Sequence, residues 1–305
     1  MGEVSIRGRV IRDMIAHVTN DHLIGKKIKT GELRKKLVEP KWKCPDCFSM
    51  TEIILPRFQM EFLCSKESPR KDYVILQLHG GGYIGAMRNA YRSFAGLYCE
   101  VSKGMGVLTI DYRVAPENPY PAALEDAVEA YGWLRDAGWS SRQIILAGDS
   151  AGGGLALALC MYLKDHNRRL PGGLVLMSPW ADLTASGPSY EDNFERDPLF
   201  GKTKDSLIYS REYLGNHNNP KEPYISPMFG EYWGFPPMLI QAGSVEMLLS
   251  DSVGVAYKAK RQGVKVRLHI YPGMFHVFQM GMMMMPESKR AWKEIGRYFE
   301  VITGV

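Results

Sequence analysis

The sequence has 305 residues, 45% hydrophobic and 23% charged, which is typical of an ordinary globular protein and excludes a disordered or collagen-like chain. No apolar run approaches the roughly 18 residues that a membrane-spanning helix needs, so we expect no stable membrane insertion. The net charge is +5, and its surplus lies within residues 1–50, where 11 Lys and Arg stand against 6 Asp and Glu.

Helical patterns and basic residues mark the N-terminal part of the chain. Apolar residues recur at helical spacing from 5 to 18, and a second helical pattern covers 31–38 before prolines interrupt it. The basic stretch 25–36 contains no aromatic residues, so we expect a solvated helix face and no nucleic-acid partner. Residues 1–48 are therefore expected to form a helical segment.

The chain carries five cysteines, an odd and small number for its length, which favours a reducing compartment and a cytoplasmic location. The N-terminus also lacks the apolar core and the cleavage site of a secretory signal. Cys44 and Cys47 form a lone C-x-x-C without a second Cys or His pair at zinc-site spacing, which favours ordinary thiols in a turn. We expect neither a metal nor a cofactor.

The rest of the chain has the pattern of a sheet flanked by helices. The stretches 50–56 and 57–64 are typical of a hairpin, and from residue 73 strand and helix patterns alternate. Such alternation predicts a mostly parallel sheet with functional groups at the carboxyl ends of its strands. A segment rich in Pro, Tyr and Phe, 182–236, interrupts the alternation and is interpreted as an inserted cap element. The predicted strands are 73–78, 106–111, 143–148, 174–178, 238–242 and 266–271, and the predicted helices are 90–103, 122–136, 151–165, 250–262 and 287–302.

A candidate nucleophile stands between a predicted strand and a predicted helix. The residues Gly148-Asp149-Ser150-Ala151-Gly152 form a G-x-S-x-G motif in that context. A tight turn of this kind holds the serine in a strained conformation with its hydroxyl presented at the sheet edge, and the glycines allow strand and helix to approach closely. No lysine follows at the spacing of a phosphate-binding loop, so we expect Ser150 to be a nucleophile.

A nucleophilic serine needs a base, and the base needs an orienting acid. His276 lies in a loop after the last predicted strand, where the order serine, acid, histidine places the base. Two acids follow the preceding strand, namely Glu246 in the turn and Asp251 after Ser250, a good N-cap residue. Asp251 would lie in the first turn of the following helix, where a negative charge has a structural role because it interacts favourably with the helix dipole. Glu246 is therefore the preferred acid and Asp251 the alternative.

A glycine-rich loop follows the first strand of the alternating region. His79 and Gly80 begin the motif, and Gly81 and Gly82 can point backbone N–H groups at a bound atom. Together with the N–H of Ala151 they are candidate donors to the oxyanion of an acyl-transfer intermediate, while His79 would hold the loop in shape. The same loop could cradle a phosphate, but the serine motif favours the oxyanion.

The motifs HGGGY, DYRVAPENPYPAALEDA, GDSAGGG, SPWADLT and YPGMFHVF, in that order, resemble those of the hormone-sensitive-lipase-like branch of the α/β-hydrolase superfamily, also called bacterial family IV esterases. The resemblance covers nearly the whole chain, most securely from residue 73. It implies an α/β-hydrolase fold with a catalytic domain of residues 49–305 and a helical cap built from residues 1–48 and an insertion near 182–225. It also implies a carboxylesterase acting on short- to medium-chain acyl esters.

Carried over residue by residue, the resemblance makes Ser150 the nucleophile, His276 the base, and Gly81, Gly82 and Ala151 the oxyanion donors. The acid departs from the commonest family pattern, in which an Asp precedes Pro-Leu, because Val245-Glu246 stands there instead. A glutamate at this point is similar to one subset of the family.

By the same resemblance, residues 111–113 would support the oxyanion loop, and Tyr83 would line the substrate pocket. Some family members pair edge strands into homodimers, and 266–271 would be the edge strand.

The main hypothesis is a metal-independent serine esterase that hydrolyses small-molecule esters through an acyl-enzyme. An amidase, lactonase or deacetylase on the same scaffold would share the catalytic residues. A non-catalytic binding protein, like the related plant gibberellin receptors, is disfavoured because such proteins usually lack the histidine that stands here at 276. A long-chain lipase is disfavoured because the sequence predicts no extended apolar surface.

Overall fold

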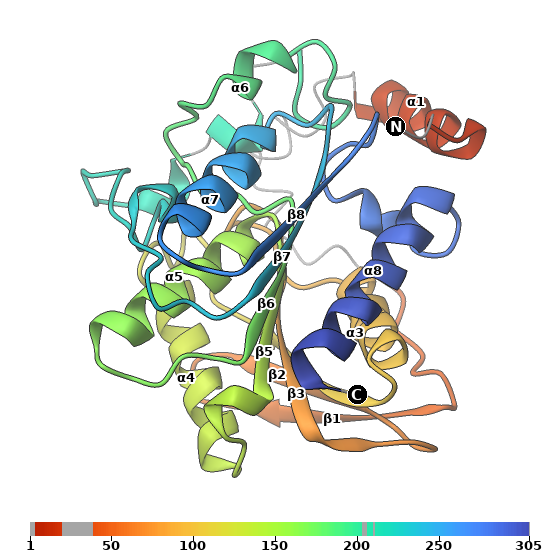
Figure 1. Cartoon of the computed structure of the whole chain (residues 1–305), viewed down its shortest axis with the longest axis vertical. Helices are drawn as coiled ribbons and strands as arrows, with labels where there is room; N and C mark the ends of the chain where they lie inside the picture. Colours follow the sequence, from red (N-terminus) through yellow and green to blue (C-terminus); the bar gives the residue numbers. More distant parts are fainter. Residues whose placement is uncertain (1–3, 20–38, 203–205, 210, 305) are drawn as a thin grey trace.

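The computed structural model describes residues 4–19, 39–202, 206–209 and 211–304, which form an eight-stranded sheet with helices on both faces (Figure 1). The strands lie in the order β1, β2, β4, β3, β5, β6, β7, β8. The pairs β1–β2 and β2–β4 are antiparallel, and the remaining pairs are parallel, which confirms the predicted mostly parallel sheet. The strands are β1 Phe48–Ile54, β2 Gln59–Ser65, β3 Arg70–Leu78, β4 Met105–Asp111, β5 Ile144–Asp149, β6 Gly173–Met177, β7 Met238–Gly243 and β8 Val266–Tyr271.

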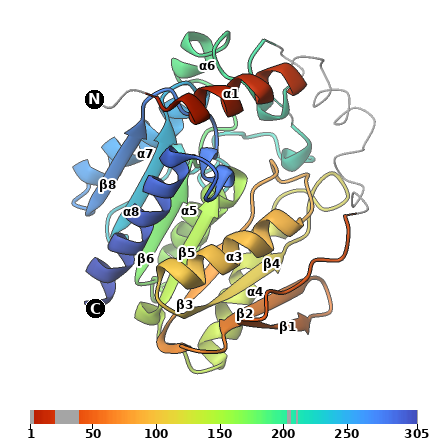
Figure 2. The same ribbon diagram turned by 90° about the vertical axis from the view of Figure 1, so that its right-hand side faces the viewer.

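Helices cover the sheet in two layers, as Figures 1 and 2 show from two sides. Helices α3 (Asn89–Val101) and α8 (Pro286–Thr303) lie on one face. Helices α4 (Ala122–Asp136), α5 (Ala151–Asp165) and α7 (Leu249–Arg261) lie on the other face. All these bounds agree with the sequence-based prediction within a few residues, whereas the predicted helix at 31–38 and the basic stretch 25–36 lie outside the described residues.

The central strands are apolar on both faces because both faces are covered. In β3, Val74 and Leu76 contribute to the apolar core under α4, α5 and α7, while Ile75 between them contributes to the core under α3 and α8. Each of these three side chains is fully buried. Two-sided burial therefore explains why residues 74–76 of β3 are consecutive apolar residues rather than alternating ones.

The strand order brings the candidate motifs to one place. The chain passes from β3 to β4 on one side, and β5 then pairs with the other side of β3. The parallel register sets Leu78, the last residue of β3, beside Gly148 of β5. Ligand sites in open α/β sheets form at such a change of direction, beyond the carboxyl ends of the strands. The glycine-rich loop and Ser150 therefore emerge side by side.

Two further segments lie over the carboxyl end of the sheet. Helix α1 (Ile6–Thr19) packs there through Ile11 and Ile15, which contact an apolar cluster that includes Met274 and Phe275 (Figure 1). In the segment between β6 and β7, the described residues form short helical elements only, namely α6 (Ser189–Asp192) and the 3₁₀ turns η2 (Leu207–Tyr209), η3 (Glu212–Leu214) and η4 (Pro227–Phe229). Among the described residues, no helix is long and apolar enough to cross a bilayer.

Candidate active site

Ser150 occupies the turn between β5 and α5, with φ 52° and ψ −122°. A positive φ is uncommon for a non-glycine residue and persists only where the surroundings enforce it. Here the turn is tight enough that a Cβ on Gly148 would overlap the Gly152 carbonyl, and a Cβ on Gly152 would overlap the Leu78 carbonyl. The two glycines of the motif are therefore required by the close approach of α5 to β3 and β5.

The structure brings Ser150, His276 and Glu246 into one hydrogen-bonded line. His276 Nε2 lies 2.9 Å from Ser150 Oγ, and His276 Nδ1 lies 3.2 Å from Glu246 Oε2. The three residues are 7%, 5% and 0% exposed. With a proton on Nδ1, the ring donates to the carboxylate and leaves Nε2 free to accept the serine proton. The arrangement can therefore activate the hydroxyl for nucleophilic attack.

The carboxyl group of Glu246 is held by opposing electrostatic effects. Its complete burial raises its pKa above the usual value, while the hydrogen bond and the charge of His276 oppose that rise. A buried carboxylate without such a partner would be unfavourable by several kcal/mol. The acid and the imidazole therefore stabilise each other as a pair.

Asp251, the alternative acid, is engaged elsewhere. Its Oδ2 accepts hydrogen bonds from the N–H groups of Ala181 and Asp182, both at 2.8 Å, and its Oδ1 accepts one from the Tyr190 hydroxyl at 3.0 Å. It is 1% exposed, and burial raises its pKa well above the usual value. Asp251 thus joins α7 to the insertion after β6.

Ser250 does not cap α7 as the sequence predicted, because the helix begins at Leu249 and its N-cap residue is Leu248. The Ser250 hydroxyl instead accepts a hydrogen bond from the N–H of Ser189 at 2.9 Å.

The glycine-rich loop after β3 has the conformation that its glycines allow. Gly81 and Gly82 have φ values of 113° and 63°, a region that side chains disfavour. A Cβ on Gly80 would overlap the carboxylate of Asp149, to which the Gly80 N–H donates at 3.2 Å. The loop therefore lies against the residue that precedes Ser150.

His79 anchors the loop from inside the protein. It is fully buried, and its ring stacks on that of Tyr112 with centroids 4.1 Å apart. Its Nδ1 lies 2.7 Å from the Gly80 carbonyl oxygen, and the Tyr112 hydroxyl donates to the His79 carbonyl at 2.7 Å. Nearby, Asp111 accepts the Met87 N–H at 3.1 Å. Tyr112 and Asp111, at the end of β4, are thus in direct contact with the glycine-rich loop and with the residues that follow it.

Tyr83 lies at the end of this loop and is 1% exposed. Its ring stacks on that of Tyr213 with centroids 3.8 Å apart. Tyr213 belongs to η3, so Tyr83 joins the loop to the insertion.

Sequence reasoning missed three buried polar residues around the site. Burial raises the pKa of Asp149 to about 7, and its Oδ2 accepts the Tyr91 hydroxyl at 3.4 Å. Asp197 accepts the N–H of Met247 at 2.7 Å, and the Asn193 amide donates to the Glu246 carbonyl at 2.9 Å. Asp197 and Asn193 therefore tie the insertion to the turn that carries Glu246. Asp149 belongs to the G-x-S-x-G motif and could have been considered from its place beside Ser150, but no local pattern marks Asn193 or Asp197.

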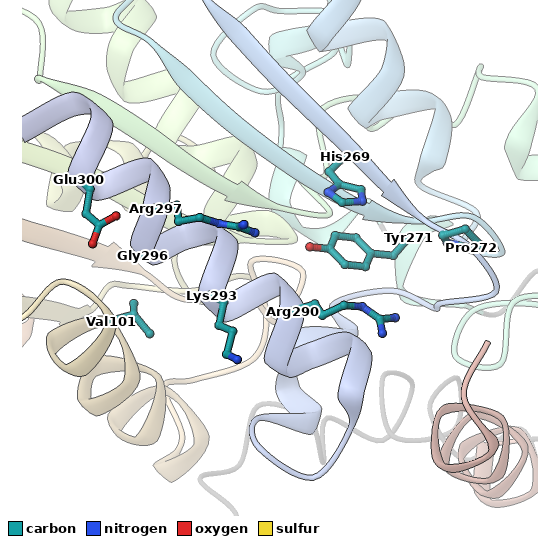
Figure 3. A pocket seen from close by; sticks show the side chains of 9 residues that line it. All are labelled: Val101, His269, Tyr271, Pro272, Arg290, Lys293, Gly296, Arg297 and Glu300. Atoms are coloured by element: carbon teal, nitrogen blue, oxygen red, sulfur yellow. The ribbon is translucent and has the colours of Figure 1, made fainter. Parts of the chain in front are cut away.

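A separate cavity of about 900 Å³ lies between α8, β8 and α3 (Figure 3). It contains none of the candidate catalytic or oxyanion residues. Its lining residues are Val101, His269, Tyr271, Pro272, Arg290, Lys293, Gly296, Arg297 and Glu300. The candidate site is therefore defined by the loops that follow β3, β5, β7 and β8, and not by this cavity.

Comparison with known proteins gives a consistent result. Residues 75–280 match a family described as having the alpha/beta hydrolase fold. An acetyl-hydrolase of Streptomyces hygroscopicus is 38% identical over 230 residues, which cover 75% of this chain and 76% of the relative.

Two solved structures also resemble the chain. A crystal structure of EstE5 soaked by p-nitrophenyl butyrate matches with a TM-score of 0.86 and 32% identity, covering 99% of this chain and 100% of EstE5. EstE7, a homologue of hormone-sensitive lipase from a metagenome library, matches with a TM-score of 0.84 and 32% identity over 98% of this chain and 99% of EstE7. The chain therefore belongs to the hormone-sensitive-lipase-like esterases of the α/β-hydrolase superfamily, and it is a carboxylic ester hydrolase.

Proposed function

We propose that the chain is a serine carboxylesterase in which Ser150, His276 and Glu246 form the catalytic triad. The observation that carries the proposal is the hydrogen-bonded line from Ser150 Oγ through the imidazole to the Glu246 carboxylate, at 2.9 and 3.2 Å. The N–H groups of Gly81, Gly82 and Ala151 are the proposed oxyanion donors. This assignment is supported by the positive φ values of the two glycines and by the place of Ala151 at the first turn of α5.

The proposed reaction has two steps. Ser150 Oγ attacks the ester carbonyl carbon, and His276 Nε2 accepts the serine proton while Glu246 stabilises the imidazolium. The tetrahedral intermediate collapses, the C–O bond to the alcohol breaks, and His276 gives its proton to the leaving alkoxide. Water then attacks the acyl-enzyme with His276 again acting as base, and the carboxylic acid leaves as Ser150 regains its proton. No metal or cofactor takes part in either step.

The proposed substrates are esters of short- to medium-chain acids. EstE5, which resembles the chain over nearly its whole length, was soaked by p-nitrophenyl butyrate, and this ester is a suitable first substrate. The proposed cap consists of residues 1–48 and an insertion near 182–225 on a catalytic domain of residues 49–305. This division is supported by the positions of α1 and of the insertion over the carboxyl end of the sheet (Figure 1).

Hydrolysis of p-nitrophenyl esters from acetate to palmitate tests the proposal. Ser150→Ala should lower kcat by about 10⁴- to 10⁶-fold. Ser252→Ala is a matched control, because Ser252 is a buried serine of α7 whose hydroxyl has no hydrogen-bond partner among the described residues. We expect Ser252→Ala to retain activity and the wild type to act best on short chains. Near-normal turnover by Ser150→Ala would contradict the proposed nucleophile.

Turnover of other substrates distinguishes the alternative functions. Faster hydrolysis of acetanilides or lactones than of simple esters would identify an amidase, deacetylase or lactonase on this scaffold. Binding of an ester without turnover by the folded wild type would favour a receptor-like protein. Faster hydrolysis of triolein than of a butyrate ester would indicate a lipase.

We further propose a cytoplasmic location and a homodimer. All five cysteines are free thiols, which supports a reducing compartment. Strand β8 lies at the edge of the sheet, where Ile270 is 37% exposed, and an unpaired edge can pair with a second copy. Size-exclusion chromatography coupled to light scattering should give a mass of twice 34.4 kDa, and a monomer mass would end the dimer proposal.

A further inference from the structure

We infer that Ser178 is a positioning residue of the proposed triad, whose hydroxyl group donates a hydrogen bond to Oε1 of Glu246 and fixes the orientation of that carboxylate. Ser178 belongs to the SPWADLT motif, to which the proposed reaction gives no role. The inference rests on the proposed function, because it concerns the acid that orients the proposed base. Ser178 acts through Glu246 and not on the substrate.

Ser178 follows β6, between the strands that lead to the proposed nucleophile and to the proposed acid. In the sheet, β6 lies between β5 and β7. The N–H of Ser178 donates to the carbonyl oxygen of Gln241 in β7 at 2.7 Å. On the other side, the N–H of Ser150 donates to the carbonyl oxygen of Met177, the residue before Ser178, at 2.9 Å. The backbone at Ser178 is therefore fixed relative to both neighbouring strands.

Ser178 and the residue that follows the proposed base share an uncommon conformation and a hydrogen bond. Ser178 has φ 46°, and Val277 has φ 48° and ψ 42°. A positive φ is uncommon for a non-glycine residue and an outlier for a β-branched one, so it persists only where the surroundings enforce it. The N–H of Val277 donates to Ser178 Oγ at 3.1 Å. The serine hydroxyl thus helps to hold the backbone beside His276.

The carboxylate of Glu246 has one oxygen with a partner and one without. Oε2 lies 3.2 Å from His276 Nδ1, whereas the buried Oε1 has no hydrogen-bond partner of ordinary geometry among the described residues. Burial raises the pKa of this carboxyl group, and the hydroxyl of Ser178, itself fully buried, is among the groups close enough to oppose that rise. A buried carboxylate oxygen without a donor is unfavourable, so a nearby hydroxyl proton is the group that Oε1 needs.

The hydroxyl of Ser178 can supply that proton. A serine hydroxyl both accepts hydrogen bonds and donates one, and Ser178 Oγ already accepts the N–H of Val277. Its proton is therefore available on another side of the oxygen, and a small movement of either side chain brings it to Glu246 Oε1. With Oε1 held, the carboxylate cannot turn about its Cγ–Cδ bond, so Oε2 stays opposite His276 Nδ1. Misplacement of a reacting group by about 1 Å can lower the rate by about 10²-fold.

A double-mutant cycle with Glu246→Gln tests the inference. The values of kcat and KM for p-nitrophenyl butyrate are measured for Ser178→Ala and Ser178→Gly, each in the wild type and in Glu246→Gln. In the wild type we expect both replacements to lower kcat by about 10-fold or more and to leave KM within about threefold, because the lost hydrogen bond orients the acid and not the ester. In Glu246→Gln, where the charge is absent, the same replacements should lower kcat by less than about threefold.

Three further variants serve as controls. Ser226→Ala is matched, because Ser226 is also fully buried and its hydroxyl accepts the N–H of Leu183 at 2.8 Å. It should leave kcat within about threefold in both backgrounds. Ser178→Gly removes the hydroxyl but adopts a positive φ without strain, so it should keep the turn. Ser150→Ala gives the background rate for the residual activity of Glu246→Gln, and urea unfolding shows whether each variant is folded in the assay.

Failure of the inference and failure of the proposed function give different results. A kcat of folded Ser178→Gly within about threefold of the wild type, beside a loss of about 10³-fold in Glu246→Gln, would overturn the role of Ser178 alone. Equal losses in both backgrounds would also overturn it, because the hydroxyl would then act through Val277 or the fold and not through the carboxylate. Near-normal kcat in Glu246→Gln would instead overturn the proposed acid, and this inference with it.

Discussion

Replacement of Glu246 by glutamine tests the part of the proposed triad that the sequence left open. The substitution preserves the shape of the side chain and removes its negative charge. Glu246 is completely buried, and its Oε2 lies 3.2 Å from His276 Nδ1. In the proposed reaction the imidazole becomes positively charged only as Ser150 attacks. The carboxylate therefore stabilises the transition state more than the ground state, so its loss should lower kcat.

The magnitude follows from the distance. Two unit charges about 4 Å apart interact by about 4 kcal/mol at the effective dielectric constant of about 20 that suits such sites. Because each 1.36 kcal/mol corresponds to tenfold in rate, kcat for p-nitrophenyl butyrate should fall by about 10³-fold. KM should change much less, because the carboxylate contacts the base and not the ester.

Asp251→Asn is the matched control for this experiment. Asp251 is equally buried but accepts hydrogen bonds from Ala181, Asp182 and Tyr190 instead of contacting the base. Its replacement should lower the free energy of unfolding and leave kcat of the folded enzyme within about threefold of the wild type. A loss of about 10³-fold in Asp251→Asn, together with near-normal kcat in Glu246→Gln, would refute the reasoning and make Asp251 the acid.

Two other predictions concern the frame of the site. Burial raises the folded-state pKa of Asp149 from an ordinary 3.8 to about 7, so its contribution to stability is most favourable below pH 4 and declines as the pH rises toward 7. Between pH 5 and pH 8 this carboxyl group should lower the free energy of unfolding by about 2–3 kcal/mol, and Asp149→Asn should remove that part of the pH dependence in urea titrations. Gly152→Ala should destabilise the protein by about 3 kcal/mol or more, or prevent folding, because its Cβ would overlap a carbonyl oxygen at the end of β3. Gly132→Ala, in the interior of α4 with no atom within 4 Å of the new Cβ, should stabilise it by about 0.5–1 kcal/mol in the same titrations.

Each of these predictions has a clear contrary result. An identical pH dependence in the wild type and Asp149→Asn would mean that this carboxyl group does not titrate between pH 5 and pH 8 in the folded protein. Equal stabilities of Gly152→Ala and Gly132→Ala would mean that the turn at Ser150 is less closely packed against β3 than described.

Several features could be predicted from the sequence because neighbouring residues determine them. Strand, tight turn and helix around Ser150 are consecutive in the chain, and the glycines at 148 and 152 follow from the backbone geometry of that turn. The continuous apolar runs of the parallel strands arise from burial on both faces, so the alternating strands and helices were predicted with bounds close to those observed. Strand β8 lies at the edge of the sheet, where the family resemblance predicted residues 266–271 to lie.

Other features depend on residues that are far apart in the chain. Glu246 and Asp251 follow the same strand and are both buried acids, and their sequence contexts favoured Glu246 without excluding Asp251. Packing separates them clearly, since one meets a histidine 30 residues further on and the other meets Ala181, 70 residues earlier.

The same reason explains what sequence analysis did not find around the site. Asp197 and Leu207 lie in an insertion without regular periodicity, so no local pattern marks the carboxylate that binds the Met247 N–H or the leucine that covers Gly82. Sequence by itself determined the chemical groups and the strands that carry them, because backbone geometry and hydrophobic periodicity are local. Tertiary structure decided which acid meets the imidazole and which side chains of the insertion pack against Gly82 and His276, because those contacts depend on how the insertion packs over the sheet.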